Sequence, residues 1–197
     1  MMLRIFLLAL PMVLMLSGCA SAPATRFYAL APVSGATVDS VPRTLVVQEV
    51  TLPRYLDRPQ LITRSDTHRL RLAEFDHWGG DLREELTRVL AANLAQRLPG
   101  STVLPAPTFT AVAPDGRIAI EVLRFEAADD GQVHLQARWR SGNTQPPQEA
   151  TFMRPRTGTA TDAALVATLS ALVGDLAQVI AQAIAQSITL NGQDQAR

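Results

Sequence analysis

The clearest structural signal in the sequence is the stretch IAIEVLRFEAADDGQVHLQARW, residues 118–139. Two apolar runs flank a polar segment that contains Asp130 and Gly131, an arrangement typical of a β-hairpin. A two-residue turn would set Leu135 opposite Glu126, whereas a three-residue loop keeps one face of the hairpin apolar, so we expect the second register. It pairs Phe125 with Leu135, Leu123 with Ala137, and Ala127 with Val133.

The expected register has two consequences along the hairpin. Gly131 takes the left-handed position of the loop, which glycine adopts without steric cost. Ile118, Ile120 and Val122 fall on the opposite face from Phe125. The sequence therefore predicts either a β-bulge or burial of both faces in that half of the hairpin.

The segments around the hairpin add strands and one helix. The helix over 81–98 has Asp81 as its expected N-cap and Glu84 three residues later, and Pro99-Gly100 ends it. Its apolar stripe is Leu82, Leu86, Val89, Leu90, Leu94 and Leu98. Residues 31–42 are expected to form a loop, and further strands are predicted at 26–30, 44–52, 60–64, 69–75, 102–104 and 149–154.

A long apolar helix is predicted from about Thr161 to Leu190, with Asn191-Gly192 as its C-terminal cap. Its polar residues fall on one narrow stripe, which favours packing across a sheet over membrane insertion. At about 1.5 Å per residue it would be roughly 45 Å long, more than a small sheet needs. Either the surplus serves oligomerisation or a kink at Gly174 wraps the helix around its own core. The stripe comprises Thr168, Asp175, Gln178, Gln182 and Gln186, with Ala171 in the gap.

These elements predict an α+β fold in which two helices, near 81–98 and 161–190, pack on one mostly antiparallel sheet. The domain organisation follows from the same pattern. Residues 1–18 form a signal peptide, 19–25 a lipidated tether, 26–191 a single domain and 192–197 a polar tail.

Composition restricts the classes of function. Eighteen basic and eighteen acidic residues balance, so neither nucleic-acid binding nor a polybasic membrane patch is indicated. All of the basic residues counted among Lys and Arg are arginines. Cys19 is the single cysteine, so no disulfide supports the fold.

The N-terminus has the pattern of a bacterial lipoprotein signal. A short basic segment to Arg4 precedes the apolar run 5–16, and Leu16-Ser17-Gly18-Cys19 resembles a lipobox. Cleavage is then expected between Gly18 and Cys19, with an S-diacylglycerol group and an N-acyl chain such as palmitate on Cys19. Ala20 follows where an Asp would signal retention in the inner membrane, so we expect the outer membrane. The alternative is an unmodified cysteine in an ordinary signal peptide or membrane helix.

The sequence lacks recognisable motifs for catalysis or metal binding. The sequence contains no phosphate-binding Gly-rich loop, no G-x-S-x-G and no H-E-x-x-H, and His68, His77 and His134 lack metal-ligand spacing. Asp76 and His77 could be half of an acid–base pair, but a solvated loop is the simpler expectation. We therefore expect no enzyme, no cofactor and no metal. A hairpin turn accounts for Asp129-Asp130, and Trp78 and Trp139 are expected to be core or interface anchors.

Several short motifs occur in an order that resembles a known family. LPRYLDRPQ (52–60) follows Tyr28-Ala29-Leu30, which stands close behind the lipobox. Downstream come Trp78 with Leu82, VLAANL (89–94) and Leu98-Pro99-Gly100. The hairpin adds Phe125, Asp130-Gly131, Val133 and Trp139. Together they resemble the PqiC-like family of ABC-type transport auxiliary lipoproteins, partners of MCE-domain intermembrane lipid transport systems.

The resemblance implies an outer-membrane lipoprotein on the periplasmic face that works with an MCE-domain protein and inner-membrane transporter components. It also implies an α+β domain and ring-like homo-oligomers in some members, and it carries no catalytic residues. A structural or assembly lipoprotein for outer-membrane proteins or lipopolysaccharide is the alternative, and a periplasmic hydrolase is a third.

The connection 53–59 is the candidate partner-binding segment. It is expected to present aromatic and arginine side chains on a rigid turn, and such residues often anchor interfaces. The alternative is that Tyr55 and Leu56 plug the end of the sheet. The candidate residues are Pro53, Tyr55, Leu56, Arg58 and Pro59.

Overall fold

A computed structural model of the protein describes residues 23–107, 113–142, 146–156 and 161–194, with side chains described as far as residue 186. The helices are α2 (Leu82–Arg97) and α3 (Asp162–Asp194). The strands are β1 (Arg26–Tyr28), β2 (Thr44–Val47), β3 (Gln60–Asp66), β4 (Arg69–Trp78), β5 (Thr102–Pro105), β6 (Gly116–Ala128), β7 (Gln132–Ser141) and β8 (Gln148–Pro155).

All eight strands belong to one sheet that branches at β6. One edge of β6 pairs along its length with β7, which pairs with β8. The other edge is shared: β2 pairs with its first residues, and β3 pairs with Ala127 and Ala128 at its end. The branches continue from β2 to β5 and from β3 through β4 to β1.

The sheet is mixed, so the prediction of a mostly antiparallel sheet is wrong. Four of the seven strand pairings are parallel, namely β1 with β4, β2 with β5, β2 with β6, and β3 with β6. Only the strands that follow one another along the chain are antiparallel. Local turn signals reveal hairpins, but the parallel neighbours are joined by long crossovers that leave no local signal.

The β6–β7 hairpin has the expected three-residue loop. Phe125 pairs with Leu135, Ala127 pairs with Val133, and Gly131 has a φ of 78°. The predicted pairing of Leu123 with Ala137 is wrong, because a bulge at Leu123 shifts the register and Val122 pairs with Ala137 instead. The bulge rotates the first half of β6 so that its apolar residues share the core face with Phe125. They are Ile118, Ile120 and Val122, all buried.

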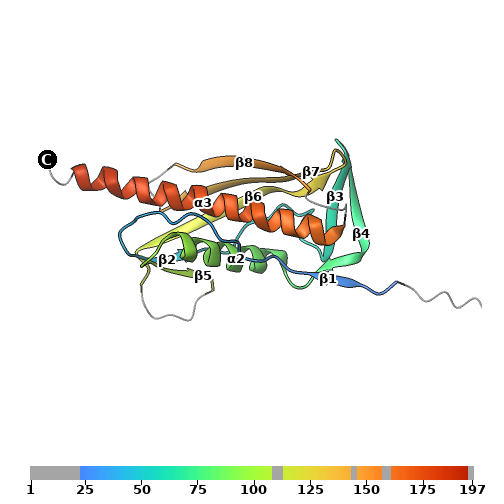
Figure 1. Ribbon diagram of the computed structural model, residues 1–197, viewed down its shortest axis with the longest axis horizontal. Helices are drawn as coiled ribbons and strands as arrows, with labels where there is room; N and C mark the ends of the chain where they lie inside the picture. Colours follow the sequence, from blue (N-terminus) through green and yellow to red (C-terminus); the bar gives the residue numbers. More distant parts are fainter. Residues whose placement is uncertain (1–22, 108–112, 143–145, 157–160, 195–197) are drawn as a thin grey trace, which may run out of the picture.

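Figure 1 shows α2 and α3 side by side over one face of the sheet. The apolar stripe predicted for α2 is buried along its whole length. Asp81 is the N-cap as predicted, since its side chain accepts hydrogen bonds from the backbone N–H groups of Arg83 and Glu84. Both tryptophans, Trp78 and Trp139, are buried in the core. The second face of the sheet carries mainly polar and charged side chains.

Two strands end three or more residues away from the predicted position. β2 ends at Val47 instead of Leu52, and Thr51 keeps only an isolated bridge to Glu121. β4 continues to Trp78, so Asp76 and His77 lie in a strand and the expected solvated loop is wrong.

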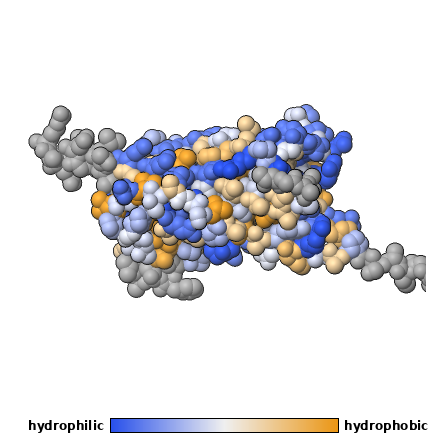
Figure 2. Space-filling view, viewed as in Figure 1, coloured by the Kyte–Doolittle hydropathy of each residue, from blue (hydrophilic) through white to orange (hydrophobic). Residues whose placement is uncertain are grey.

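Helix α3 is apolar and long enough to span a membrane by length and composition, but 61% of its apolar 18-residue stretch is buried within the protein. Its exposed residues begin with Ala163 and Ala167 and continue with Gln182 and Gln186, whereas Thr168 is buried. Figure 2 shows mildly hydrophobic residues gathered near its first half. The helix passes Asn191 and Gly192 and reaches Asp194, so the predicted cap is wrong: glycine permits a helix to stop but does not require it.

The first part of the loop 31–42 crosses both helices. We call this part, together with Leu30, the N-terminal strap (residues 30–38). The backbone N–H groups of Leu30 and Val33 donate to Glu85 Oε1 (2.9 Å) and Asn93 Oδ1 (2.8 Å) of α2. The N–H of Ala31 donates to Ser170 Oγ of α3 at 3.2 Å. The strap therefore joins the two helices through their own buried polar side chains.

Arg97 locks the strap in place. Arg97 is 2% exposed, and its guanidinium donates to the carbonyl of Val33 (3.1 Å) and to Gln178 Oε1 of α3 (3.1 Å). Burial lowers the pKa of Arg97 because the charged form is desolvated. Gly35 and Gly174 leave room for this group, since a Cβ on Gly35 would collide with the guanidinium.

Gly174 of α3 faces Val33 of the strap, and a Cβ on Gly174 would collide with Val33 Cγ2. Alanine favours a helix over glycine by about 1 kcal/mol, yet we expect Gly174→Ala to lower the free energy of unfolding by about 1–3 kcal/mol through overpacking. Adding Val33→Ala should remove most of that loss. Urea denaturation of the four proteins of this cycle checks the coupling, and additive effects would contradict the contact.

Burial raises the pKa of Glu85 above its ordinary value, while the Leu30 N–H opposes the shift. The folded state therefore binds the proton more readily than the unfolded state, and stability falls as pH rises from about 4 upward. Glu85→Gln keeps the acceptor for Leu30 and removes the titration. We expect the variant to gain stability relative to the parent as pH rises, measured by urea denaturation across pH 4–8, with exposed Glu74→Gln as the control.

Candidate partner-binding surface

The connection between β2 and β3 is a compact turn held at both ends. The N–H of Leu56 donates to the carbonyl of Pro53 and that of Arg58 to the carbonyl of Leu56, each at 2.9 Å. Pro59 accepts from the N–H of Trp78 at 2.7 Å, which ties the turn to the end of β4. The rigidity expected from the sequence is therefore present.

The five candidate residues do not share one exposed surface. Leu56 is 3% exposed and belongs to the core, and Tyr55 is half-buried against it. Pro53 is also partly buried, whereas Arg58 and Pro59 are exposed. The alternative in which Tyr55 and Leu56 fill the end of the sheet matches these placements, and a contact with a partner through Arg58 and Pro59 stays a prediction.

Tyr55 lies beside a buried carboxylate on the second face of the sheet. Glu126 is 0% exposed, and its Oε1 accepts from Nε of Arg64 and from Nε of Arg124, the latter at 3.0 Å. Desolvation and, secondarily, the negative charge of Glu126 raise the pKa of Tyr55 to about 12. The Tyr55 hydroxyl therefore adjoins an ion-pair cluster whose carboxylate is buried and whose two arginines are partly exposed.

The exposed part of the connection adjoins the start of α2. Arg83 of α2 pairs with Asp57 at 3.2 Å and fixes the turn against the helix. A cavity of about 290 Å³ lies between them, with Arg58 and Pro59 on one side and Gly80 on the other. We call this region the Arg58 surface; it offers an exposed guanidinium, which forms no ion pair with the described residues, beside a rigid proline-containing turn.

Asp76 and His77 do not form an acid–base pair. Asp76 is buried and accepts from Arg26 Nε (2.6 Å) and from the hydroxyl of Tyr28 (2.9 Å). The hydrogen bond from Arg26 is the main reason that the pKa of Asp76 is lowered. His77 points to the opposite face, as neighbouring strand residues do, and its ring meets Phe27 edge-on with centroids 6.1 Å apart.

Metal and anchor sites are the remaining candidates. Within the described residues no three His, Cys, Asp or Glu side chains lie close enough together to hold a metal ion. Gly18 and Cys19 lie outside the described residues. The chain enters the domain at β1, at the opposite end of the long axis from the C-terminal end of α3 (Figure 1).

Two groups of polar residues were not predicted from the sequence. Glu85, Asn93 and Arg97 lie at intervals of eight and four on one side of α2 and hold the strap. Their helical spacing was visible in the sequence and could have indicated a buried polar stripe. Arg71 and Arg156 meet at one cavity, but they are so far apart in the sequence that no local pattern connects them.

The comparison with known protein families decides the assignment. Residues 28–181 match the family described as the ABC-type transport auxiliary lipoprotein component. The chain belongs to this family. It is also 30% identical, over 130 residues, to the intermembrane transport lipoprotein PqiC of Escherichia coli, which covers 64% of this chain and 68% of that protein. The PqiC of Shigella flexneri matches to the same extent. The PqiC-like resemblance is confirmed.

Solved structures share the fold of this auxiliary lipoprotein. An uncharacterised protein superposes with a TM-score of 0.68 at 21% identity, covering 82% of this chain and 99% of its own. A Xanthomonas campestris protein gives 0.67 at 16% identity, covering 88% and 100%. The auxiliary lipoprotein therefore has an established α+β fold, and its family is one of transport components.

Because Leu56 is buried and Arg58 is exposed, we expect alanine substitution to affect stability differently at the two positions. We expect Leu56→Ala to lower the free energy of unfolding by about 2–4 kcal/mol because it leaves a core cavity. Arg58→Ala should change it by less than about 0.5 kcal/mol because the side chain is exposed. Chemical denaturation of both variants measures this, and equal losses would mean that Arg58 is structural and unavailable to a partner.

Proposed function

We propose that this auxiliary lipoprotein is anchored in the outer membrane, faces the periplasm and acts as the docking component of an MCE-type intermembrane lipid transport system. The family match over residues 28–181 carries the proposal. The name of the relatives, intermembrane transport lipoprotein, adds the class of process. The docking step itself is inferred from the anchor and the shape of the domain.

The anchor follows from the lipobox that ends at Cys19. One acyl chain holds a protein only marginally, whereas several chains hold it stably, at about 0.8 kcal/mol per buried CH₂. An S-diacylglycerol group and an N-acyl chain on Cys19 would suffice without a membrane-spanning helix. Ala20 supports sorting to the outer membrane.

The domain is elongated, and its tether enters at one end (Figure 1). The far end, where α3 terminates, can then extend toward an assembly that arrives from the inner membrane. At about 1.5 Å per residue, the 33 residues of α3 are roughly 50 Å long, and its last turns extend beyond the sheet. This surplus supports self-association through α3, in line with the ring-like oligomers that the resemblance implies.

The Arg58 surface is the part of the connection that a partner can reach. Asp57 is already paired with Arg83, whereas the Arg58 guanidinium is exposed on a fixed turn. Arginine on a rigid element suits a protein interface because little conformational freedom is lost on binding.

Affinity purification of the full-length protein from solubilised envelopes, followed by mass spectrometry, tests the proposal. We expect an MCE-domain protein in the eluate, with Arg58→Ala reducing its yield severalfold and exposed Arg140→Ala leaving it unchanged. Recovery of outer-membrane assembly proteins alone would contradict the proposal and favour an assembly role.

The anchor is tested separately in cells. Cys19→Ala should move the protein out of the membrane fraction and abolish complementation of a deletion strain, because the docking domain is no longer held at the membrane. Fractionation by sucrose gradient locates the parent protein, for which we expect the outer-membrane fractions. Full complementation by a Cys19→Ala protein that is no longer in the membrane fraction would contradict the anchored mechanism.

A further inference from the structure

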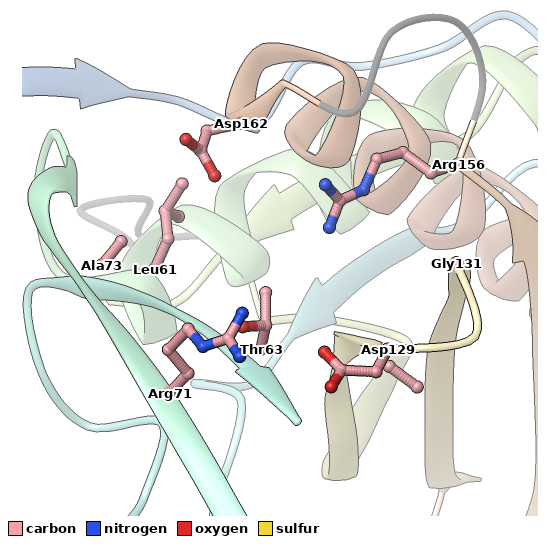
Figure 3. Close-up of a pocket in the computed structure, with 9 residues that line it drawn as sticks. Leu61, Thr63, Arg71, Ala73, Asp129, Gly131, Arg156 and Asp162 are labelled. Carbon is pink, nitrogen blue, oxygen red and sulfur yellow. The ribbon is translucent and has the colours of Figure 1, made fainter. Parts of the chain in front are cut away.

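A cavity of about 420 Å³ opens between the β3–β4 hairpin, the tip of the β6–β7 hairpin and the start of α3. Leu61 and Ala73 form an apolar part of its wall, and Thr63 adds a hydroxyl group. Figure 3 shows that four charged side chains from separate elements point into the same space. They are Arg71, Arg156, Asp129 and Asp162.

The two arginines face the cavity without ion-pair partners. None of the ion pairs formed among the described residues involves Arg71 or Arg156. Arg156 Nε is buried and has no hydrogen-bond partner in the described part of the chain. The backbone of Arg156 is fixed, because its N–H donates to the carbonyl of Gly131 at 2.9 Å. A buried donor without a partner costs free energy that a ligand oxygen could recover.

The carboxylates complete the charge pattern. Oδ2 of Asp162 lies 3.6 Å from Nη2 of Arg26, so this ion pair already offsets the negative charge of Asp162. No ion pair of the described residues involves Asp129, which is exposed at the hairpin tip. A ligand that carried only a phosphate would be attracted by both arginines and repelled by Asp129. A ligand with a phosphate and an ammonium group would match both signs.

The cavity also lies at the anchored end of the domain. Arg26 belongs to β1, seven residues after Cys19 in the sequence, and its ion pair with Asp162 connects that strand to the cavity wall. Figure 1 shows β1, the start of α3 and the β3–β4 hairpin at the same end of the molecule. A lipid headgroup from the anchoring membrane is therefore the ligand source nearest to the site.

We propose that this cavity binds the zwitterionic headgroup of an aminophospholipid of the phosphoethanolamine type. Arg71 and Arg156 contact the phosphate, Asp129 receives the ammonium group, and Thr63 offers a further hydrogen bond. The inference rests on the proposed role in lipid transport for its ligand source, and on the four side chains for its ligand chemistry. It gives the auxiliary lipoprotein a direct contact with the transported or surrounding lipid.

The test is titration of the full-length lipidated protein, in phosphate-free detergent, with glycerophosphoethanolamine, followed by calorimetry. We expect saturable binding that Arg71→Gln and Arg156→Gln each weaken about tenfold or more, as expected for a charge-assisted contact. Arg140→Gln removes the same charge on the second face of the sheet and should have no effect. Thermal unfolding confirms that each variant is folded.

Asp129→Asn separates the possible ligand sources. It should weaken glycerophosphoethanolamine binding severalfold and strengthen binding of inorganic phosphate, since the repulsion is removed. If the parent binds inorganic phosphate as tightly as glycerophosphoethanolamine, the cavity is a free-phosphate site and the proposal is wrong. The absence of binding of either probe also overturns it.

Reconstitution into vesicles supplies the membrane readout, because the acyl chains anchor the protein whatever the headgroup. The anchored parent should unfold at a higher temperature in phosphatidylethanolamine–phosphatidylcholine vesicles than in phosphatidylcholine alone, and Arg71→Gln should remove the difference. Equal shifts for parent and variant would contradict the proposal. Recovery of an MCE-domain protein is measured independently. Headgroup binding without that partner would overturn only the docking role. Recovery of the partner without headgroup binding would overturn only this site.

Discussion

The packing of the domain depends on polar side chains that are buried at two helices, each of which makes at least one specific hydrogen bond. The N-terminal strap crosses α2 and α3, and its backbone N–H groups reach Glu85, Asn93 and Ser170. Arg97 completes the junction through Val33 and Gln178. A charged side chain that is 2% exposed is tolerated only when its donors are satisfied. The strap, both helices and the glycines that admit Arg97 are therefore mutually dependent.

The bulge at Leu123 has a comparable influence on the sheet. By inserting one residue, it turns Ile118, Ile120 and Val122 toward the helices along with Phe125. The opposite face is left to charged residues, among them Glu126 and its two arginines. Tyr55 adjoins this cluster and packs against the core, so the segment predicted to meet a partner also contributes to the packing of the domain. Of the five candidate residues, Arg58 and Pro59 are the two that remain exposed for binding.

Sequence patterns were sufficient for features that are decided within a few residues. The Asp81 cap, the stripe of α2 and the Gly131 loop each depend on neighbours close in the chain, and each was predicted. The parallel pairings of β2 and β3 with β6, the strap and the Arg71–Arg156 cavity depend on contacts between distant segments. Ala31 and Ser170, for example, are 139 residues apart. Propensity and periodicity hold no information on such partners, so these features required the structure.

The parallel pairing of β1 with β4 bears on mechanical load. A protein tethered by its N-terminus feels tension along the chain that enters β1, and the rungs to β4 lie across that direction. Tension would therefore shear the backbone bonds together instead of opening them one at a time, and the paired Arg26 and Asp76 resist the same displacement. Beyond β1 the load passes to the strap and is divided between two helices. Under the proposed anchoring through Cys19, this arrangement would resist pulling from the membrane at the first strand of the domain.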